Sequence, residues 1–298
     1  MREIMIRIAV VGYGNIGKFA VEAVDAAPDM ELAGVVRRKA GGENLPGIQV
    51  VEDIRALGPV DVALLCVPTR SVEETALQYL AAGYHTVDSF DIHTNIPALH
   101  RSLHQAAVEA GKVSVISSGW DPGSDSVVRA LMQACAPSGV TYTNFGPGMS
   151  MGHTVAVKAI EGVEGALSMT IPVGSGIHRR MVYVQLKPGA KLEEVAAKIK
   201  ADPYFVHDET HVVAVDDINA VMDRGHGVHM VRKGTSGKTD NQCFEFNMSI
   251  NNPALTAQVM VSCARAAMRQ KPGCYTMIEI PVVDLLPGDR DQWVASLV

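Results

Sequence analysis

The sequence predicts an α/β protein in which a doubly wound parallel sheet is joined to a second, α+β domain. Strand-like and helix-like segments alternate over residues 1–120, whereas later segments alternate apolar and polar residues with period two. Hydrophobic residues make up 47% of the 298 residues and charged residues 19%. Repeated β-α-β units with short connections form parallel sheets, and this apolar content suffices for a sizeable core.

The first domain opens with a strand at residues 6–11, "IRIAVV", because a continuous apolar run is typical of a parallel strand covered on both faces. A helix is expected over about residues 16–26, ahead of Pro28. The same reasoning places strands at residues 31–36, 60–67, 85–89 and 112–117, and helices at residues 71–83 and 96–110.

The pattern of predicted elements changes in the second domain, which begins with an expected helix at residues 124–135. The segments "RRMVYVQL" (179–186) and "CFEFNMSI" (243–250) alternate with period two and are separated by an amphipathic helix at residues 191–200. Such alternation predicts an antiparallel sheet with one covered face.

A long helix at residues 253–270 is expected to return the chain to the first domain, where residues 275–283 should pack. We therefore expect a dinucleotide-binding domain at residues 1–120, a substrate and dimerisation domain at residues 121–252, and a C-terminal segment at residues 253–298 that returns to the first domain.

The bulk composition argues against several classes of protein. The formal net charge is −6, so the composition does not indicate a nucleic-acid binder. Five scattered cysteines without a C-x-x-C pair indicate neither a zinc site nor a disulfide framework, and we expect a cytoplasmic protein with reduced thiols. No apolar run is long enough to span a bilayer, and the first residues run directly into a strand pattern, so no membrane partner is expected.

The stretch "VVGYGNIGKFA" indicates a dinucleotide site. Gly12, Gly14 and Gly17 have G-x-G-x-x-G spacing after a strand and at the start of a helix. In this pattern the first glycine permits a tight turn, the second lets the backbone approach a pyrophosphate, and the third lets the helix pack on the strand. We expect the intervening Tyr13, Asn15 and Ile16 to contact the cofactor as well.

Cations stand where an acid would hold the ribose hydroxyl of NAD. Arg37, Arg38 and Lys39 follow the second strand, and the next carboxylate is Glu43. A guanidinium suits a 2′-phosphate, so NADP is favoured over NAD; the competing interpretation is a solvated run of charges. Further cofactor contacts are expected at the ends of the next strands, from Cys66, Val67, Pro68, Thr69, Ser89, Phe90, Ser118, Gly119 and Pro122.

Two aspartates mark the expected reaction centre. Asp91 in "VDSFDIH" and Asp121 in "SSGWDPG" follow two predicted strands, with Asp88 nearby. Ligands of open α/β sheets bind at this edge, and carboxylates that converge there need a cation to offset their repulsion. No metal-binding spacing of His or Cys accompanies them, so a substrate ammonium is favoured over a metal.

Five segments together, "GYGNIG", "VDSFDIH", "SSGWDPG", "FGPGMSMGHT" and "INNPALTA", resemble the meso-diaminopimelate dehydrogenase family over most of the chain. The resemblance implies a homodimer with a Rossmann-like domain, a dimerisation domain and a substrate domain. It also implies oxidative deamination of the D-centre of meso-2,6-diaminopimelate with NADP⁺, which gives L-2-amino-6-oxopimelate, ammonia and NADPH.

The resemblance also implies roles for individual residues. Asp91 and Asp121 grip the reacting ammonium, and the adjacent carboxylate is bordered by Trp120, Met151, Gly152 and His153. The far, L-configured end is bound by Thr170, Arg180, His226 and Asn252. Arg180 can bind a carboxylate with two hydrogen bonds, and fixing both ends of the substrate positions one hydrogen for transfer. Which aspartate or water takes the proton is left open.

Two departures from the family pattern suggest a broader substrate range. Phe145, a further expected substrate contact, stands where better-known members have tryptophan, and residues 173–178 form a shorter loop. A roomier pocket would allow reductive amination of simpler 2-oxo acids to D-amino acids.

Two alternatives to this function remain. Another NADP-dependent two-domain reductase of amino-acid biosynthesis is one; the dihydrodipicolinate type is disfavoured because no adjacent histidine pair with a following lysine is present. A non-catalytic nucleotide-sensing regulator is the other, although Asp91 and Asp121 would have no purpose in it.

Overall fold

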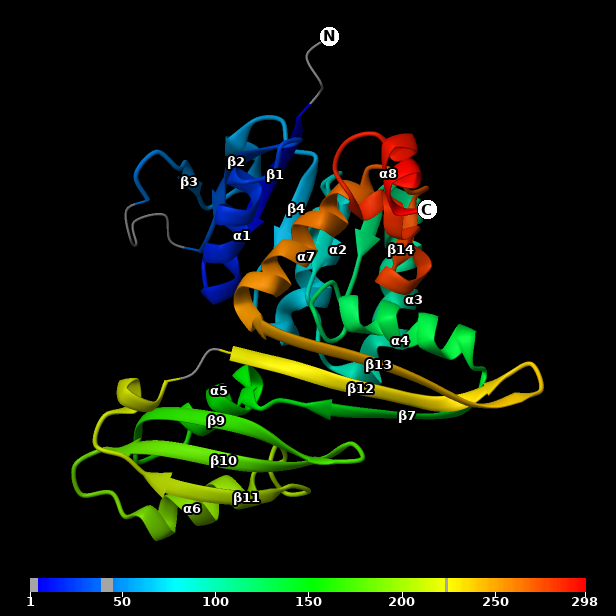
Figure 1. Cartoon of the computed structure of the whole chain (residues 1–298). Helices are drawn as coiled ribbons and strands as arrows, with labels where there is room; N and C mark the ends of the chain where they lie inside the picture. The colour runs from blue at the N-terminus through cyan, green and yellow to red at the C-terminus, as the bar shows by residue number, and fades with distance from the viewer. Residues whose placement is uncertain (1–4, 39–44, 223–224) are drawn as a thin grey trace. The chain divides into compact units, whose positions relative to one another are not determined.

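The computed structural model describes residues 5–38, 45–222 and 225–298 (Figure 1). The chain divides into two compact units. Unit 1 comprises Met1–Ala130 with Pro253–Val298, and unit 2 comprises Leu131–Asn252. Unit 1 thus continues beyond residue 120, where we expected the first domain to end. The turn after Trp120 folds back on itself, because the backbone N–H of Asp125 donates to the Trp120 carbonyl at 3.0 Å, and it stays with unit 1.

Unit 1 contains the predicted doubly wound sheet, and every pair of neighbouring strands in it is parallel. Its seven strands run in the order β14-β6-β5-β4-β1-β2-β3. The chain order reverses between β1 and β4, and ligands of such sheets bind at this switch point. The strands are β1 (Ile6–Val11), β2 (Met30–Val36), β3 (Val50–Val51), β4 (Val62–Leu65), β5 (His85–Asp88), β6 (Val113–Val115) and β14 (Gly273–Tyr275).

Helices cover both faces of this sheet, which explains why its strands are continuous apolar runs. Figure 1 shows α1, α2 and α7 around the strands of this sheet. Side chains alternate along β1: Ile8 and Val10 pack with α1 and α7, while Ala9 and Val11 pack on the other face with α2 and α3. The helices that lie wholly or mostly in unit 1 are α1 (Asn15–Asp25), α2 (Val72–Ala81), α3 (Ile96–Ala110), α4 (Ser124–Cys135), α7 (Asn252–Ala267) and α8 (Arg290–Leu297).

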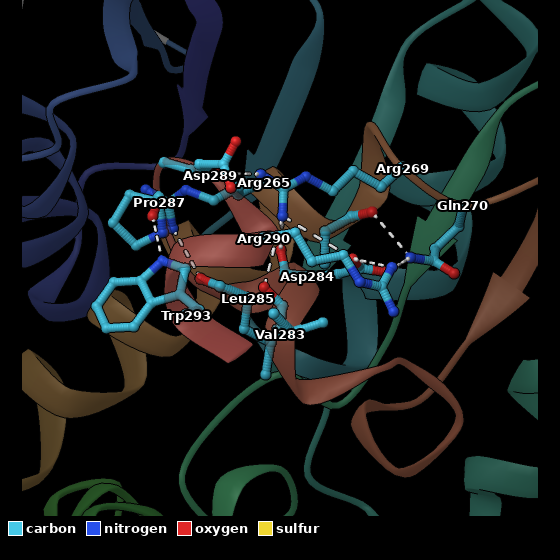
Figure 2. A network of polar contacts seen from close by, with 12 residues as sticks. Arg265, Arg269, Gln270, Val283, Asp284, Leu285, Pro287, Asp289, Arg290 and Trp293 are labelled. Carbon is cyan, nitrogen blue, oxygen red and sulfur yellow. Dashed lines mark hydrogen bonds and ion pairs between the residues drawn. The ribbon is translucent and has the colours of Figure 1, made fainter. Parts of the chain in front are cut away.

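The C-terminal segment belongs to unit 1 and is joined to α7 by hydrogen bonds of buried charged groups (Figure 2). The Arg265 guanidinium on α7 donates to both carboxylate oxygens of Asp29 at 2.5 and 2.6 Å and to the Leu285 carbonyl at 2.9 Å. Gln270 donates to the Asp284 carboxylate at 3.0 Å. Since the Arg265 side chain is only 4% exposed, these bonds orient the C-terminal segment on the helix.

Unit 2 contains two sheets rather than the single antiparallel sheet that we expected. The segment 179–186 lies in a four-stranded sheet of order β11-β10-β9-β8, whereas 243–250 lies in a three-stranded sheet of order β13-β12-β7. The first sheet is mixed, because α6 connects β10 to β11 as a crossover and makes that pair parallel. The second is antiparallel, and its residues Phe244, Phe246 and Met248 share the more buried face as the period-two pattern predicts.

The bounds of the elements in unit 2 complete the description. The strands are β7 (Ser138–Phe145), β8 (Gly148–Met149), β9 (Val163–Gly174), β10 (Ile177–Leu186), β11 (Glu209–Ala214), β12 (Gly225–Ser236) and β13 (Thr239–Asn251), and the helices are α5 (Met151–Lys158) and α6 (Leu192–Ala201). Within the described ranges of the whole chain, no helix combines the length and apolar character needed to cross a membrane.

Candidate active site

The glycine turn between β1 and α1 has the geometry that the motif predicts. Gly12 has φ +95°, and a Cβ there would lie 2.4 Å from the Cys66 carbonyl oxygen. A Cβ on Gly17 would lie 2.2 Å from the Gly12 carbonyl oxygen. A Cβ on Gly14 would meet no atom of the described residues within 4 Å. Gly12 therefore serves the tight turn and Gly17 the packing of the helix on the strand, while Gly14 leaves the backbone open to a ligand.

The predicted arginines follow β2 directly, at the carboxyl edge of the sheet. The backbone N–H of Arg37 donates to the Val51 carbonyl at 2.9 Å, which continues the pairing of β2 with β3. The Arg37 side chain is partly exposed and Arg38 is exposed. Lys39 lies outside the described residues.

Asp88, at the end of β5, connects the two loops that carry the predicted aspartates. Its Oδ1 accepts from the backbone N–H groups of Phe90 at 2.9 Å and Ser117 at 3.1 Å. Its carbonyl accepts from Ser118 at 2.7 Å. Because Asp88 is fully buried, desolvation raises the pKa of its carboxyl to about 6, against the lowering effect of these hydrogen bonds. The side chain holds one loop against the other.

Those loops bring Asp91 and Asp121 close together. Thr69 donates its hydroxyl to Asp91 Oδ1 at 2.7 Å. The pKa of Asp121 is raised, chiefly by burial and also by the negative charge of Asp91, while a hydrogen bond from Asp125 and the charge of Arg129 lower it. Neighbouring carboxylates at the carboxyl edge of a parallel sheet form an anionic centre that suits a cation.

Asp125, in the first turn of α4, is a third acid of this centre and one that our sequence analysis missed. Its side chain is fully buried, and Oδ2 accepts from Arg129 at 2.8 Å. Burial and the charge of Asp121 raise the pKa of Asp125 to about 7. An acid in the first turn of a helix is usually explained by the helix dipole, so the sequence alone gives this residue no special status.

In unit 2, Thr170 and Arg180 are cross-strand partners on β9 and β10. The Arg180 guanidinium donates to the Thr170 hydroxyl through Nη1 and to Asp208 Oδ2 through Nε at 2.6 Å. Asp208, which the sequence analysis did not identify, thereby fixes one edge of the guanidinium. A planar cation held in this way is suited to carboxylate recognition.

Two histidines accompany this cation. Nδ1 of His153 and Oγ of Ser150 are hydrogen-bonded at 2.7 Å. The His153 ring contacts Phe205 edge-on, with the ring centroids 5.0 Å apart. Burial, followed by the charge of Arg180, lowers the pKa of His153 to about 4, so the ring is neutral at neutral pH. His178 accepts at Nε2 from the backbone N–H of Phe145 at 2.7 Å, and the two rings are 5.6 Å apart.

The other residues implied by the resemblance are distributed over both units. Trp120 is buried in the turn after β6. Met151 and Gly152 begin α5, and Gly152 is exposed. His226 is buried on β12, where its Nδ1 accepts from the backbone N–H of the next residue at 2.9 Å. Asn252 begins α7.

Two protein families match the chain. Residues 6–117 match the oxidoreductase family with an NAD-binding Rossmann fold. Residues 119–252 match the diaminopimelic acid dehydrogenase C-terminal domain. The two matches together include both loops of the anionic centre and the arginine of unit 2.

Individual proteins give the same result. The meso-diaminopimelate D-dehydrogenase of Bacteroides fragilis is 66% identical over 98% of this chain and 99% of its own length. The solved structure of Corynebacterium glutamicum DAP dehydrogenase in complex with DAP has a TM-score of 0.90 and 30% identity, with all of both chains covered. An engineered D-amino acid dehydrogenase bound to NADP⁺ has a TM-score of 0.85 and 29% identity over 99% of this chain and 100% of its own. On these grounds the chain belongs to the diaminopimelate dehydrogenase family of oxidoreductases.

Proposed function

We propose that this protein oxidatively deaminates the D-centre of meso-2,6-diaminopimelate with NADP⁺ and gives L-2-amino-6-oxopimelate, ammonia and NADPH. The observation that carries the proposal is the anionic centre of Asp91 and Asp121 at the same sheet edge as the open glycine turn, in a chain 66% identical to a meso-diaminopimelate D-dehydrogenase. A dehydrogenase acting on an amine needs this combination of a cation-binding centre and a dinucleotide site.

The described residues fit a phosphorylated dinucleotide. Gly14 leaves room for a pyrophosphate beside the first N–H groups of α1, and Arg37 and Arg38 are suited to a 2′-phosphate. Bound there, the dinucleotide supplies the hydride acceptor. We assign further contacts to the strand-end segments: Tyr13, Asn15, Ile16, Cys66, Val67, Pro68, Thr69, Ser89, Phe90, Ser118, Gly119 and Pro122.

At the reacting end, Asp91 and Asp121 bind the ammonium of the D-centre. Hydride leaves from a carbon that bears a neutral amine, so the ammonium first loses a proton within this centre. Water then attacks the resulting imine carbon. We propose that the carboxylate next to the D-centre contacts Trp120, Met151, Gly152 and His153.

The arginine of unit 2 serves the far, L-configured end of the substrate. Arg180, held by Asp208, donates to the distal carboxylate, with further hydrogen bonds from Thr170, His226 and Asn252. Each charge-assisted hydrogen bond of this kind contributes about 1.5–3 kcal/mol. This end selects the length and configuration of the substrate.

We further propose that the protein is cytoplasmic and forms a homodimer. On the three-stranded sheet, β7 leaves Val140 53% and Tyr142 36% exposed, and the register places Lys233 and Val231 of β12 beside them. A sheet face with exposed apolar side chains is suited to an isologous contact with a second copy.

The turn between β9 and β10 favours a second activity, reductive amination of simpler 2-oxo acids to D-amino acids. Gly174 pairs with Ile177, so the connection is only two residues long. Phe145 packs beside His178 in the same unit. A short connection and a phenylalanine occupy less space than a longer loop and a tryptophan, so bulkier or shorter 2-oxo acids should be accepted. Oxidation of NADPH with ammonia and pyruvate or phenylpyruvate tests this; rates equal to background would reject it.

Purified protein mixed with NADP⁺ and meso-diaminopimelate tests the main proposal. We expect NADPH absorbance to rise with release of one ammonia for each NADPH formed, and a much smaller rate with NAD⁺. If neither nucleotide is reduced, the assigned reaction is wrong.

A further inference from the structure

The turn after β6 brings a buried acid beside Asp121. The backbone N–H groups of Ser124 and Asp125 donate to the carbonyls of Gly119 and Trp120 at 3.1 and 3.0 Å. These bonds fold the chain back, so that Asp121 and Asp125 are joined by a side-chain hydrogen bond. Asp125 is 1% exposed, whereas Asp121 is partly exposed.

Two carboxyl groups joined in this way must share a proton, since carboxylate oxygens only accept hydrogen bonds. The charged groups around them decide how firmly the proton is held. Arg129, on α4, donates to Asp125 at 2.8 Å and favours ionisation. Asp91, after β5, and the burial of the pair oppose it. Burial and the negative charge of Asp121 raise the pKa of Asp125 to about 7, so the pair as a whole holds one proton below about pH 7.

We propose that Asp121 and Asp125 act together as the proton acceptor for the substrate ammonium, with Asp125 as the positioning residue that takes up the transferred charge through its hydrogen bond to Asp121. This inference rests on the proposed function and assigns the proton transfer that the family resemblance left open. Arg129 sets the pH at which the pair is ready to accept.

The proton transfer balances within the pair. One N–H bond of the ammonium breaks, its electron pair stays on nitrogen, and an O–H bond forms on Asp121 of the doubly ionised pair. The hydrogen bond between Asp121 and Asp125 then shares that proton between two oxygens. In the direction of amination the same proton returns to nitrogen. A general base works best when its conjugate acid has a pKa near the working pH, which the pair provides and a lone exposed aspartate does not.

The structure also permits a purely structural role, in which Asp125 and Arg129 form an i, i+4 ion pair that stabilises α4. The two roles differ in what they do to the pH profile. Loss of a helix contact lowers activity at every pH, whereas a change to the pair removes the rise in activity near neutral pH or moves the pH at which it occurs.

We therefore compare the pH dependence of kcat/KM for meso-diaminopimelate oxidation in the wild type, Asp125→Asn and Arg129→Met. Asparagine keeps a donor to Asp121 but cannot ionise. The rise near neutral pH should disappear in Asp125→Asn, with at least ~10-fold lower activity above it. In Arg129→Met the rise should move to higher pH, because a cation that favours ionisation is gone. Asp291→Asn, at another helix first turn, is the matched control and should leave the profile unchanged.

Loss of the rise in Asp125→Asn together with its shift to higher pH in Arg129→Met supports the pair, and an unchanged profile in Asp125→Asn overturns it. A second measurement does not depend on activity. Infrared difference spectra without substrate, wild type minus Asp125→Asn, should show the C=O band of one protonated carboxyl that disappears as the pH passes about 7. Absence of this band at low pH contradicts the proposal. If the band is present but meso-diaminopimelate is not oxidised, the assigned substrate is wrong and the shared proton is not.

Discussion

Replacement of Asp88 by asparagine measures how much the free energy of unfolding falls when the buried carboxyl that connects the two aspartate loops becomes ionised. The Asp88 carboxyl is fully buried, and its Oδ2 meets no hydrogen-bond partner within the described part of the chain. Its pKa rises from 3.8 in an exposed setting to about 6 in the fold. Since one pH unit corresponds to about 1.4 kcal/mol, the difference amounts to about 3 kcal/mol.

The sign follows from which state holds the proton. Between about pH 4 and pH 6 the folded protein keeps the proton on Asp88 and the unfolded chain has lost it, so stability falls as the pH rises through this window. Asparagine cannot ionise. The free energy of unfolding of the wild type should therefore fall by about 3 kcal/mol relative to Asp88→Asn between about pH 4 and about pH 7. Any cost of the amide group itself is independent of pH and cancels.

Urea unfolding followed by tryptophan fluorescence is the suitable assay. Both tryptophans of the sequence, Trp120 and Trp293, belong to unit 1, so the signal reports the unit that contains Asp88. A difference between the wild type and Asp88→Asn that stays constant over this pH range would refute the reasoning. It would mean that the buried carboxyl is ionised at no cost.

Three further predictions concern cofactor and substrate binding. The double variant Arg37→Gln, Arg38→Gln should weaken NADP⁺ binding by ~10–100-fold and NAD⁺ binding much less, because each lost charged hydrogen bond costs about 1.5–3 kcal/mol. Fluorescence titration measures both affinities, and equal losses would show that no 2′-phosphate is bound there. Gly12→Ala should lower the melting temperature, since a Cβ would lie 2.4 Å from a carbonyl oxygen at φ +95°. Gly14→Ala should fold normally and bind NADP⁺ weakly. A lower melting temperature in Gly14→Ala than in Gly12→Ala would contradict the assigned roles. Asp208→Asn should raise KM for meso-diaminopimelate ~10-fold with little change in kcat, because it loosens the guanidinium that it holds at 2.6 Å; an unchanged KM would separate this arginine from the substrate.

Most of unit 1 could be predicted from the sequence, because apolar runs, glycine spacing and the positions of Pro28 and Gly111 act locally. The helix expected at residues 96–110 has these bounds in the structure, and Gly111 ends it with φ +64°. The glycine turn was predictable for the same reason: Gly12 and Gly17 have steric roles that the chain itself defines, and Gly14 lies between them in the same motif.

Unit 2 was less predictable, because period-two alternation shows that a strand has two different faces but not which strand it pairs with. The segments 179–186 and 243–250 have the same alternation of apolar and polar residues, yet they lie in different sheets. Their sheets depend on contacts between residues far apart in the chain, such as Arg180 with Thr210 and Arg232 with Thr141.

The site shows the same division. That Asp91 and Asp121 lie near each other could be predicted, because each follows a predicted strand at the same edge of the sheet. Asp125 and Asp208 could not, since their importance comes from a neighbour reached only after folding, Asp121 in one case and Arg180 in the other. Their residue types alone describe a helix first turn and a polar loop.

The stereochemical origin of the transferred hydride tests the central claim most directly. Meso-diaminopimelate carrying deuterium on the carbon of its D-centre should give deuterated NADPH, and material labelled on the carbon of its L-centre should give unlabelled NADPH. LL-diaminopimelate, which has no D-centre, should leave NADP⁺ unreduced. Label transferred from the L-centre, or reduction of NADP⁺ by the LL isomer at a comparable rate, would contradict the assignment of the reaction to the D-centre.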